Sequence, residues 1–162
     1  MIRRPPRSTL SSSSAASDVY KRQELKQLAS ETKKDGKPLI QDPIFAARVA
    51  NTEIDLANLE ISNLRILSRA QAGGSPGPES SILKILGSEI GQEIDSLTRR
   101  ALGRRATIHV PNILDYGYNG PNISPINTAT AAGVYFNNRK TSIYGGSNEI
   151  QKNIISKAVL EL

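Results

Sequence analysis

The sequence contains no cysteine, a single histidine and no long run of apolar residues. Without cysteine the chain can form neither a disulfide nor a thiolate nucleophile. The one histidine, His109, has no cysteine partners, so the sequence does not indicate a structural zinc site. A transmembrane helix needs about 18 consecutive apolar residues, and none is predicted here. These absences leave a chain of 162 residues, which is the usual size for one domain with a hydrophobic core.

Strong positive charge is also missing from most of the chain. The formal net charge is +6, but residues 1–23 hold five basic residues and only one acidic residue. Residues 24–162 hold 16 basic and 14 acidic residues, without a basic stripe or interleaved aromatic residues. The charge pattern therefore argues against nucleic-acid binding.

The opening segment, MIRRPPRSTLSSSSAASDVYKRQ, differs in composition from the rest of the chain. It is rich in Ser, Arg and Pro and shows no apolar periodicity, so we expect residues 1–23 to be disordered. Its Arg- and Ser-rich composition is easily mistaken for that of a transit peptide, and it lacks the apolar centre of a secretory signal. The string also resembles a translated sequencing adapter, and we interpret it as a non-native artefact. The domain is therefore predicted to comprise residues 24–162.

Apolar residues at helical spacing begin at Ile44 and continue to about Ala70. Asp42 and Pro43 precede them, and this pair is typical of a helix start. The helix has two apolar faces, so we expect it to pack on both sides, within a bundle or between subunits. The main face comprises Phe45, Val49, Leu56, Leu59 and Ile66, and the second comprises Ile54, Ile61 and Leu64.

Glycine and proline between residues 71 and 78 predict a linker, and a second long helix follows from about Glu79 to Leu102, stopped by Gly103. Residues 104–126 have no regular pattern and predict a long loop. Asn127 can cap a short helix that ends near Asn138, and the last helix follows a glycine pair. Together with a short helical piece from residue 24 and a turn at residues 35–36, this pattern predicts an all-α, antiparallel helical bundle.

The stretch SIYGGSNEIQKNII places that glycine pair directly before the last helix. Gly145 and Gly146 permit backbone angles that other residues resist, and they let a ligand or another chain approach the main chain. Ser147 is at the N-cap position, where free amides favour an anionic or acceptor-rich ligand. A capped turn that serves only packing explains the same residues.

The turn and its helix, IYGGSNEIQKNIISKAVLEL, resemble the C-terminal signature of the acyl-CoA dehydrogenase family. The stretch PLIQDPIFAARVANTEIDLANLEISNLRILSRAQAGGSPGPESSILKI is similar to the first long helix, linker and second-helix start of bacterial members. The resemblance covers essentially all of residues 24–162. It implies the C-terminal helical domain of an FAD-dependent enzyme that converts acyl-CoA thioesters to 2-enoyl-CoA in the bacterial cytoplasm.

The resemblance also implies residues of the cofactor site. Ser147 and Glu149 match positions that contact the FAD, and Gly146 belongs to the same turn. Tyr144 matches the aromatic position that walls the substrate near the flavin.

A second implied contact lies at the end of the second long helix. Arg100 through Gly103 match a segment that reaches the FAD of a neighbouring subunit. The family usually has a glutamine and a Gly-Gly pair there, whereas this chain has Arg100 and Gly103–Arg104.

The family's catalytic base has no counterpart in this chain. Gly145 occupies the position at which many members carry the catalytic glutamate, and glycine cannot remove a proton. Other members carry the base on an earlier helix, which would lie upstream of residue 24. Glu149 is expected to face the cofactor rather than the substrate α-carbon. We therefore assign no catalytic residue and predict no metal ligand.

The resulting interpretation is a C-terminal fragment of an acyl-CoA dehydrogenase that is inactive on its own. The implied partners are an acyl-CoA substrate, other subunits in a homo- or hetero-oligomer, and an electron-accepting flavoprotein. Two alternatives stay open. One is a base-less subunit that pairs with an active partner, and the other is a stand-alone helical interaction module without flavin.

Overall fold

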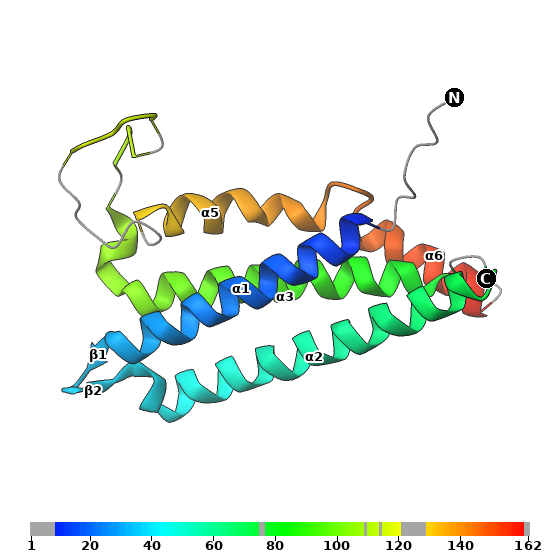
Figure 1. The fold of residues 1–162 in the computed structure, drawn as a ribbon, viewed down its shortest axis with the longest axis horizontal. Coiled ribbons are helices and arrows are strands. Elements are labelled where there is room, and N and C mark those ends of the chain that lie inside the picture. The colour runs from blue at the N-terminus through cyan, green and yellow to red at the C-terminus, as the bar shows by residue number, and fades with distance from the viewer. Residues whose placement is uncertain (1–8, 75–76, 109, 114, 121–128, 161–162) are drawn as a thin grey trace.

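The computed structural model of the chain describes residues 9–74, 77–108, 110–113, 115–120 and 129–160 (Figure 1). Its α-helices are α1 (Thr9–Glu31), α2 (Pro43–Gln71), α3 (Glu79–Leu102), α5 (Ala131–Asn137) and α6 (Asn148–Leu160). Short 3-10 helices lie between them, namely η1 (Leu39–Gln41), η2 (Gly103–Thr107) and η3 (Asn138–Ser142). The predicted all-α fold is confirmed.

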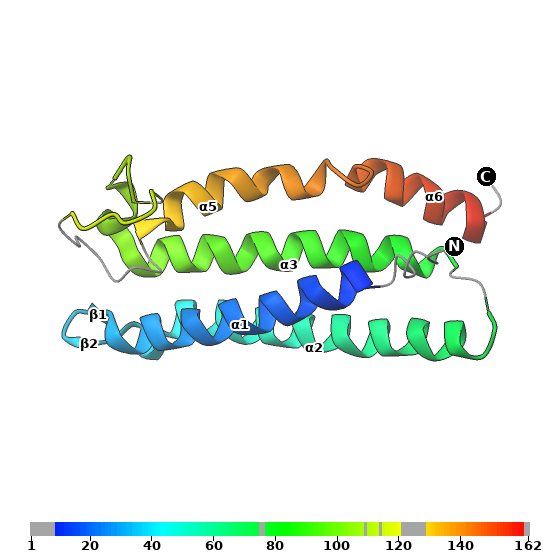
Figure 2. The same cartoon turned by 45° about the horizontal axis from the view of Figure 1, so that its top comes forward.

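Helix α3 forms the middle layer of the bundle. Figure 2 shows α5 and α6 on one side of α3, and α1 and α2 on the other. Helices α1, α2, α5 and α6 all contact α3, and α1 also contacts α2. Helix α2 runs antiparallel to α3, and so do α5 and α6 (Figure 1). Helix α3 therefore packs against α1 on one side and against the segment that carries the glycine turn on the other.

The start of α2 forms as its sequence predicts. The Asp42 carboxylate accepts a hydrogen bond from the Phe45 amide at 2.9 Å, and Pro43 occupies the first helical turn. The predicted turn at residues 35–36 is also confirmed, because Asp35 and Gly36 both have positive φ and join strands β1 (Lys33–Lys34) and β2 (Lys37–Pro38). The expected cap of the short helix, Asn127, lies outside the described residues.

The hydrophobic core lies where α1, α2 and α3 meet. Its most deeply buried side chains are Leu25, Leu56, Ile94 and Leu97. Helix α2 contributes Phe45, Val49, Leu56 and Leu59, which are four of the five residues of its predicted main face. Apolar burial of this kind is the main favourable contribution to folding.

Helix α1 corrects the expected extent of the disordered tail. It begins at Thr9 and includes residues that the sequence assigned to an unfolded segment, whereas residues 1–8 lie outside the described part. Asp18 is buried and Val19 packs against the core. No proline or glycine interrupts residues 9–31, so a helix fixed by Leu25 and Ala29 can extend upstream. The adapter origin of the segment stays a prediction.

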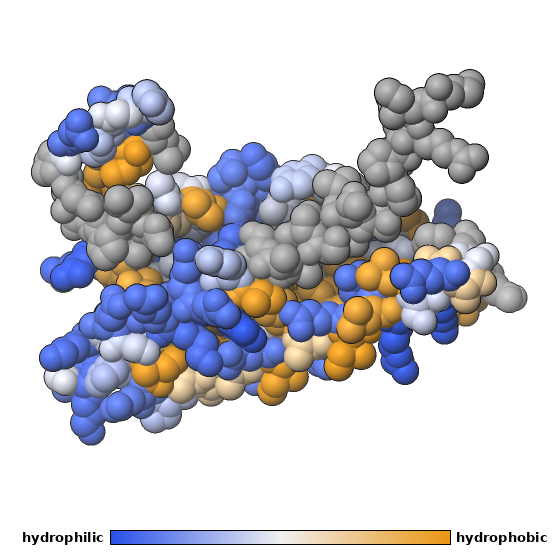
Figure 3. Space-filling view, viewed as in Figure 1, coloured by the Kyte–Doolittle hydropathy of each residue, from blue (hydrophilic) through white to orange (hydrophobic). Residues whose placement is uncertain are grey.

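The second apolar face of α2 is exposed in this chain. Ile54, Ile61 and Leu64 are 58%, 56% and 64% exposed, and Ile44 on the same helix is 77% exposed. Figure 3 shows apolar side chains along the edge of the molecule formed by α2. Within the described part of the chain, this face therefore has no covering element.

Candidate functional site

The segment between η3 and α6 forms a glycine turn with left-handed backbone. Gly145 has φ of 73° and Gly146 has φ of 91°, a region in which other residues are strained. A Cβ atom on Gly146 would lie 2.5 Å from Gln151 Nε2, whereas a Cβ atom on Gly145 would meet no atom within 4 Å. The turn therefore needs glycine at both positions, and the main chain at Gly145 is open to an approaching group.

Ser147 caps the start of α6, as the sequence predicts. Its Oγ accepts a hydrogen bond from the Ile150 amide at 3.4 Å. The Glu149 carboxylate is exposed and is held by its own backbone amide and by the Ser147 hydroxyl. These hydrogen bonds lower the pKa of Glu149, with smaller contributions from Lys152 and Lys84. Glu149 is therefore an ionised, weakly basic carboxylate at a helix start.

Tyr144 lies at the beginning of the turn and is 56% exposed. Its backbone amide donates to the Lys140 carbonyl oxygen at 3.1 Å, so the residue follows directly from η3. Tyr144, Gly146, Ser147 and Glu149 lie within six consecutive positions, and the structure places this segment at the surface.

The other two residues predicted to bind the cofactor lie far from this turn within the chain. Arg100 and Gly103 are exposed at the C-terminal end of α3, whereas Lys84, near the helix start, contacts the turn region. A helix rises about 1.5 Å per residue, so Lys84 and Arg100 are about 24 Å apart along α3. The structure therefore does not join the two predicted contacts into one site of a single chain.

A buried polar contact anchors the turn from beneath, and the sequence did not predict it. Asn148, at the first position of α6, is only 8% exposed and its Oδ1 accepts from Lys84 Nζ at 2.7 Å. Ser88 lies 3.3 Å from the same side-chain amide group. Lys84 and Ser88 are four residues apart on α3 and therefore share a face of the helix. This spacing of two polar residues is the feature of the sequence that could have predicted a polar contact here.

Segment η3 is fixed to α3 by a second polar group. Gln92 Nε2 donates to the Asn138 carbonyl oxygen at 3.1 Å and to Thr141 Oγ1 at 3.0 Å. The guanidinium of Arg139 lies 4.6 Å from the Tyr135 ring centroid and donates to the Gln92 carbonyl oxygen. The guanidinium of Arg99 lies 4.7 Å from the same centroid. These cations therefore pack on an aromatic ring of the protein itself.

The described residues contain neither a cluster of metal ligands nor a membrane-spanning helix. No group of three or more histidine, aspartate or glutamate side chains in that part could hold a metal ion. Likewise, no helix there is long and apolar enough to cross a bilayer. His109 lies outside the described residues.

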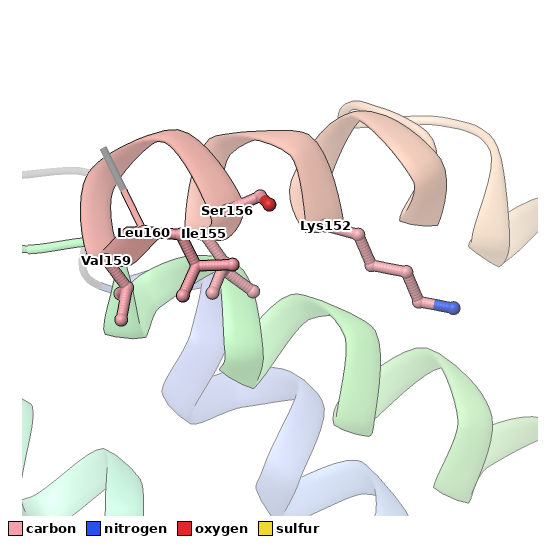
Figure 4. A pocket seen from close by; sticks show the side chains of 5 residues that line it. All are labelled: Lys152, Ile155, Ser156, Val159 and Leu160. Carbon is pink, nitrogen blue, oxygen red and sulfur yellow. The ribbon is translucent and has the colours of Figure 1, made fainter. Parts of the chain in front are cut away.

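One open hollow of about 290 Å³ lies along α6. Figure 4 shows its lining side chains, Lys152, Ile155, Ser156, Val159 and Leu160. None of them belongs to the predicted cofactor-binding residues. The hollow is therefore separate from the glycine turn.

The fold is an all-α bundle in which an exposed glycine turn precedes the last helix, and this defines the class as a helical-bundle domain. The profile described as "Acyl-CoA dehydrogenase, C-terminal domain" matches residues 15–160, and the chain belongs to this family. The match begins before residue 24, in agreement with the early start of α1. A comparison with curated proteins found no match.

Three solved structures illustrate the similarity in fold. The ChsE4–ChsE5 complex from Mycobacterium tuberculosis is 25% identical with a TM-score of 0.70, covering 91% of this chain and 36% of that chain. The FAD complex of PigA is 17% identical with a TM-score of 0.72, covering 91% and 34%. Butyryl-CoA dehydrogenase from Megasphaera elsdenii is 16% identical with a TM-score of 0.67, covering 95% and 36%. The chain thus spans about a third of the length of these proteins.

Proposed function

We propose that the chain is the C-terminal part of an FAD-dependent acyl-CoA dehydrogenase, which converts an acyl-CoA thioester to 2-enoyl-CoA. The observation that carries this proposal is the turn of Tyr144 to Ser147, whose geometry suits a cofactor and whose sequence matches the family signature. In the whole enzyme this chain contributes part of the FAD site and a subunit interface. Alone it is inactive.

The residues of the turn fit one edge of a flavin nucleotide. The open main chain at Gly145 admits a planar group, and the Ser147 hydroxyl and the first amides of α6 offer polar contacts. Ser147 and Glu149 would hold the cofactor, while Tyr144, which is half exposed, would border the substrate. FAD, when bound, supplies the hydride acceptor.

The proton-abstracting base is supplied from outside the described residues. Gly145 has no side chain, and the hydrogen-bonded Glu149 is a weak base because its pKa is lowered. In the proposed enzyme, a glutamate on an earlier helix serves as the base. Glu149 instead orients the cofactor through its ionised carboxylate.

Arg100 and Gly103 serve a different copy of the cofactor. Because they are about 24 Å along α3 from the turn region, they would contact the FAD of a neighbouring subunit. The exposed face of α2 supports such an assembly, since isolated domains rarely leave large apolar patches uncovered. We propose that an electron-accepting flavoprotein reoxidises the enzyme and that the enzyme acts in the bacterial cytoplasm.

A second candidate is a base-less subunit of a hetero-oligomer. Gly145 favours it, because the chain carries no side chain at the usual base position. The similar ChsE4–ChsE5 structure is a complex of two different proteins. In this alternative the chain pairs with a subunit that carries the base.

The test is to sequence the genomic DNA upstream of the codons for this chain and to express the complete reading frame. The proposal expects an in-frame middle domain and an earlier helix with a glutamate, and a protein whose FAD is bleached by acyl-CoA. An upstream frame without that glutamate, together with activity only after addition of a second subunit, supports the hetero-oligomer. A genuine start codon at Met1 and no FAD binding would refute both.

A further inference from the structure

One side chain of α3 contacts both ends of the glycine turn. Lys84 Nζ donates to the carbonyl oxygen of Ser142 at 3.2 Å, before the turn, and to Asn148 Oδ1 at 2.7 Å, after it. Lys84 and Asn148 are 64 positions apart in sequence, so this contact exists only in the folded chain. The ammonium therefore bridges η3 and α6 beneath Tyr144–Ser147.

The bridge is strong because of its charge and burial. Lys84 forms none of the ion pairs between described residues, and its ammonium donates to the neutral oxygens of Ser142 and Asn148. Its charge also acts, more weakly, on the Glu149 carboxylate. Hydrogen bonds with one ionised partner are roughly twice as strong as neutral ones. Asn148 is 8% exposed, so the loss of its donor would leave a buried oxygen without a charged partner.

The turn itself cannot provide this rigidity. Gly145 and Gly146 give the chain the required positive φ angles, but glycine has more conformational freedom than any other residue. The cap by Ser147 is a long hydrogen bond of 3.4 Å, and the contact from Gln151 Nε2 to the Gly145 carbonyl oxygen is equally long. The Gln151 amide donates to the Ser147 carbonyl oxygen at 2.9 Å, but this bond lies at the start of α6 and does not reach α3. The short contact from Lys84, with the longer one from Ser88, ties this end of the turn to α3.

We propose that Lys84 is a positioning residue, which holds both ends of the turn against α3 and so fixes where Ser147 and Glu149 face the cofactor. The inference rests on the proposed function, because it takes the turn as the cofactor-facing part of the chain. Lys84 does not touch the cofactor. It acts through the Ser142 carbonyl group and the Asn148 side chain.

The test is amide hydrogen exchange on the full chain, comparing residues 143–151 with residues 90–97 of α3. Lys84→Met keeps the aliphatic stem and removes the donor, so exchange in the turn region should rise about tenfold while exchange in α3 stays unchanged. Asn148→Asp keeps the acceptor and should leave the turn protected, whereas Asn148→Leu should expose it. Lys157→Met, which removes an exposed lysine of α6, is the charge-matched control and should change neither region.

Three results would overturn the inference. They are unchanged exchange in the turn of Lys84→Met, equal acceleration in both regions, and protection in Asn148→Leu equal to that in Asn148→Asp. Titration with FAD, followed by flavin fluorescence, separates this inference from the proposed function. If the complete protein binds no FAD but the exchange pattern is as expected, the cofactor role fails and the anchoring role stands.

Discussion

The burial of Asp18 makes the stability of this chain depend on pH. The Asp18 side chain is 11% exposed and faces Lys21 on α1, at 4.0 Å, and Gly91 and Asp95 on α3. Burial raises the pKa of Asp18 from its ordinary 3.8 to about 6, Lys21 lowers it, and Asp95 raises it. Because the folded chain binds this proton more tightly, Asp18 stabilises the fold most below pH 3.8 and loses that contribution as the pH rises through about 6.

The magnitude follows from the size of the shift. About two pH units correspond to about 3 kcal/mol, and solvent screening of this incompletely buried carboxylate reduces the contribution to roughly 1–3 kcal/mol. Asp18→Asn should therefore raise the free energy of unfolding at pH 7.5 by that amount and have little effect near pH 4. Urea unfolding followed by circular dichroism between these pH values measures the difference. Asp55→Asn, an exposed change on α2, is the control. An equal pH dependence in Asp18→Asn and the unmodified chain would refute the reasoning.

Three further changes test the core, the turn and the stacked cations. Leu56→Ala should lower the free energy of unfolding by about 2–5 kcal/mol, whereas Ile54→Ala, two residues away on the exposed face, should change it by less than about 0.5 kcal/mol in thermal unfolding. Gly146→Ala should accelerate amide exchange around the turn, because the added Cβ meets Gln151 and φ is positive; unchanged exchange would contradict the turn geometry. Tyr135→Leu should cost about 1–2 kcal/mol by removing the ring on which two guanidinium groups stack, and an unchanged Tm would show that this stacking contributes nothing.

Local signals in the sequence predicted the two long helices α2 and α3 and the glycine turn correctly. Asp42 with Pro43 gave the start of α2, and the apolar spacing gave its buried face, including Leu56. The glycine pair gave a turn with positive φ before a helix capped by Ser147. Each of these depends on residues a few positions apart, so the chemistry of a short segment is sufficient.

The prediction failed where packing against distant residues decides the outcome. Composition alone assigned residues 1–23 to a disordered tail, but α1 extends from Thr9, and its Val19 and Leu25 pack in the core formed with α2 and α3. Apolar periodicity gave α2 a second face without deciding what covers it, and that face is exposed in this chain. The roles of Tyr144, Ser147 and Glu149 toward FAD stay predictions.

The sequence by itself determined where helices form, which faces are apolar, where the glycine turn lies and which family the chain resembles. Only the tertiary structure decided that Asp18 is buried against α3, that Lys84 contacts both ends of the turn, and that Arg100 lies at the opposite end of α3 from these contacts. The physical reason is the separation along the sequence between the residues that interact. A helix or a cap is set by neighbours within about four residues, whereas these contacts join side chains that only the packing of the bundle brings together.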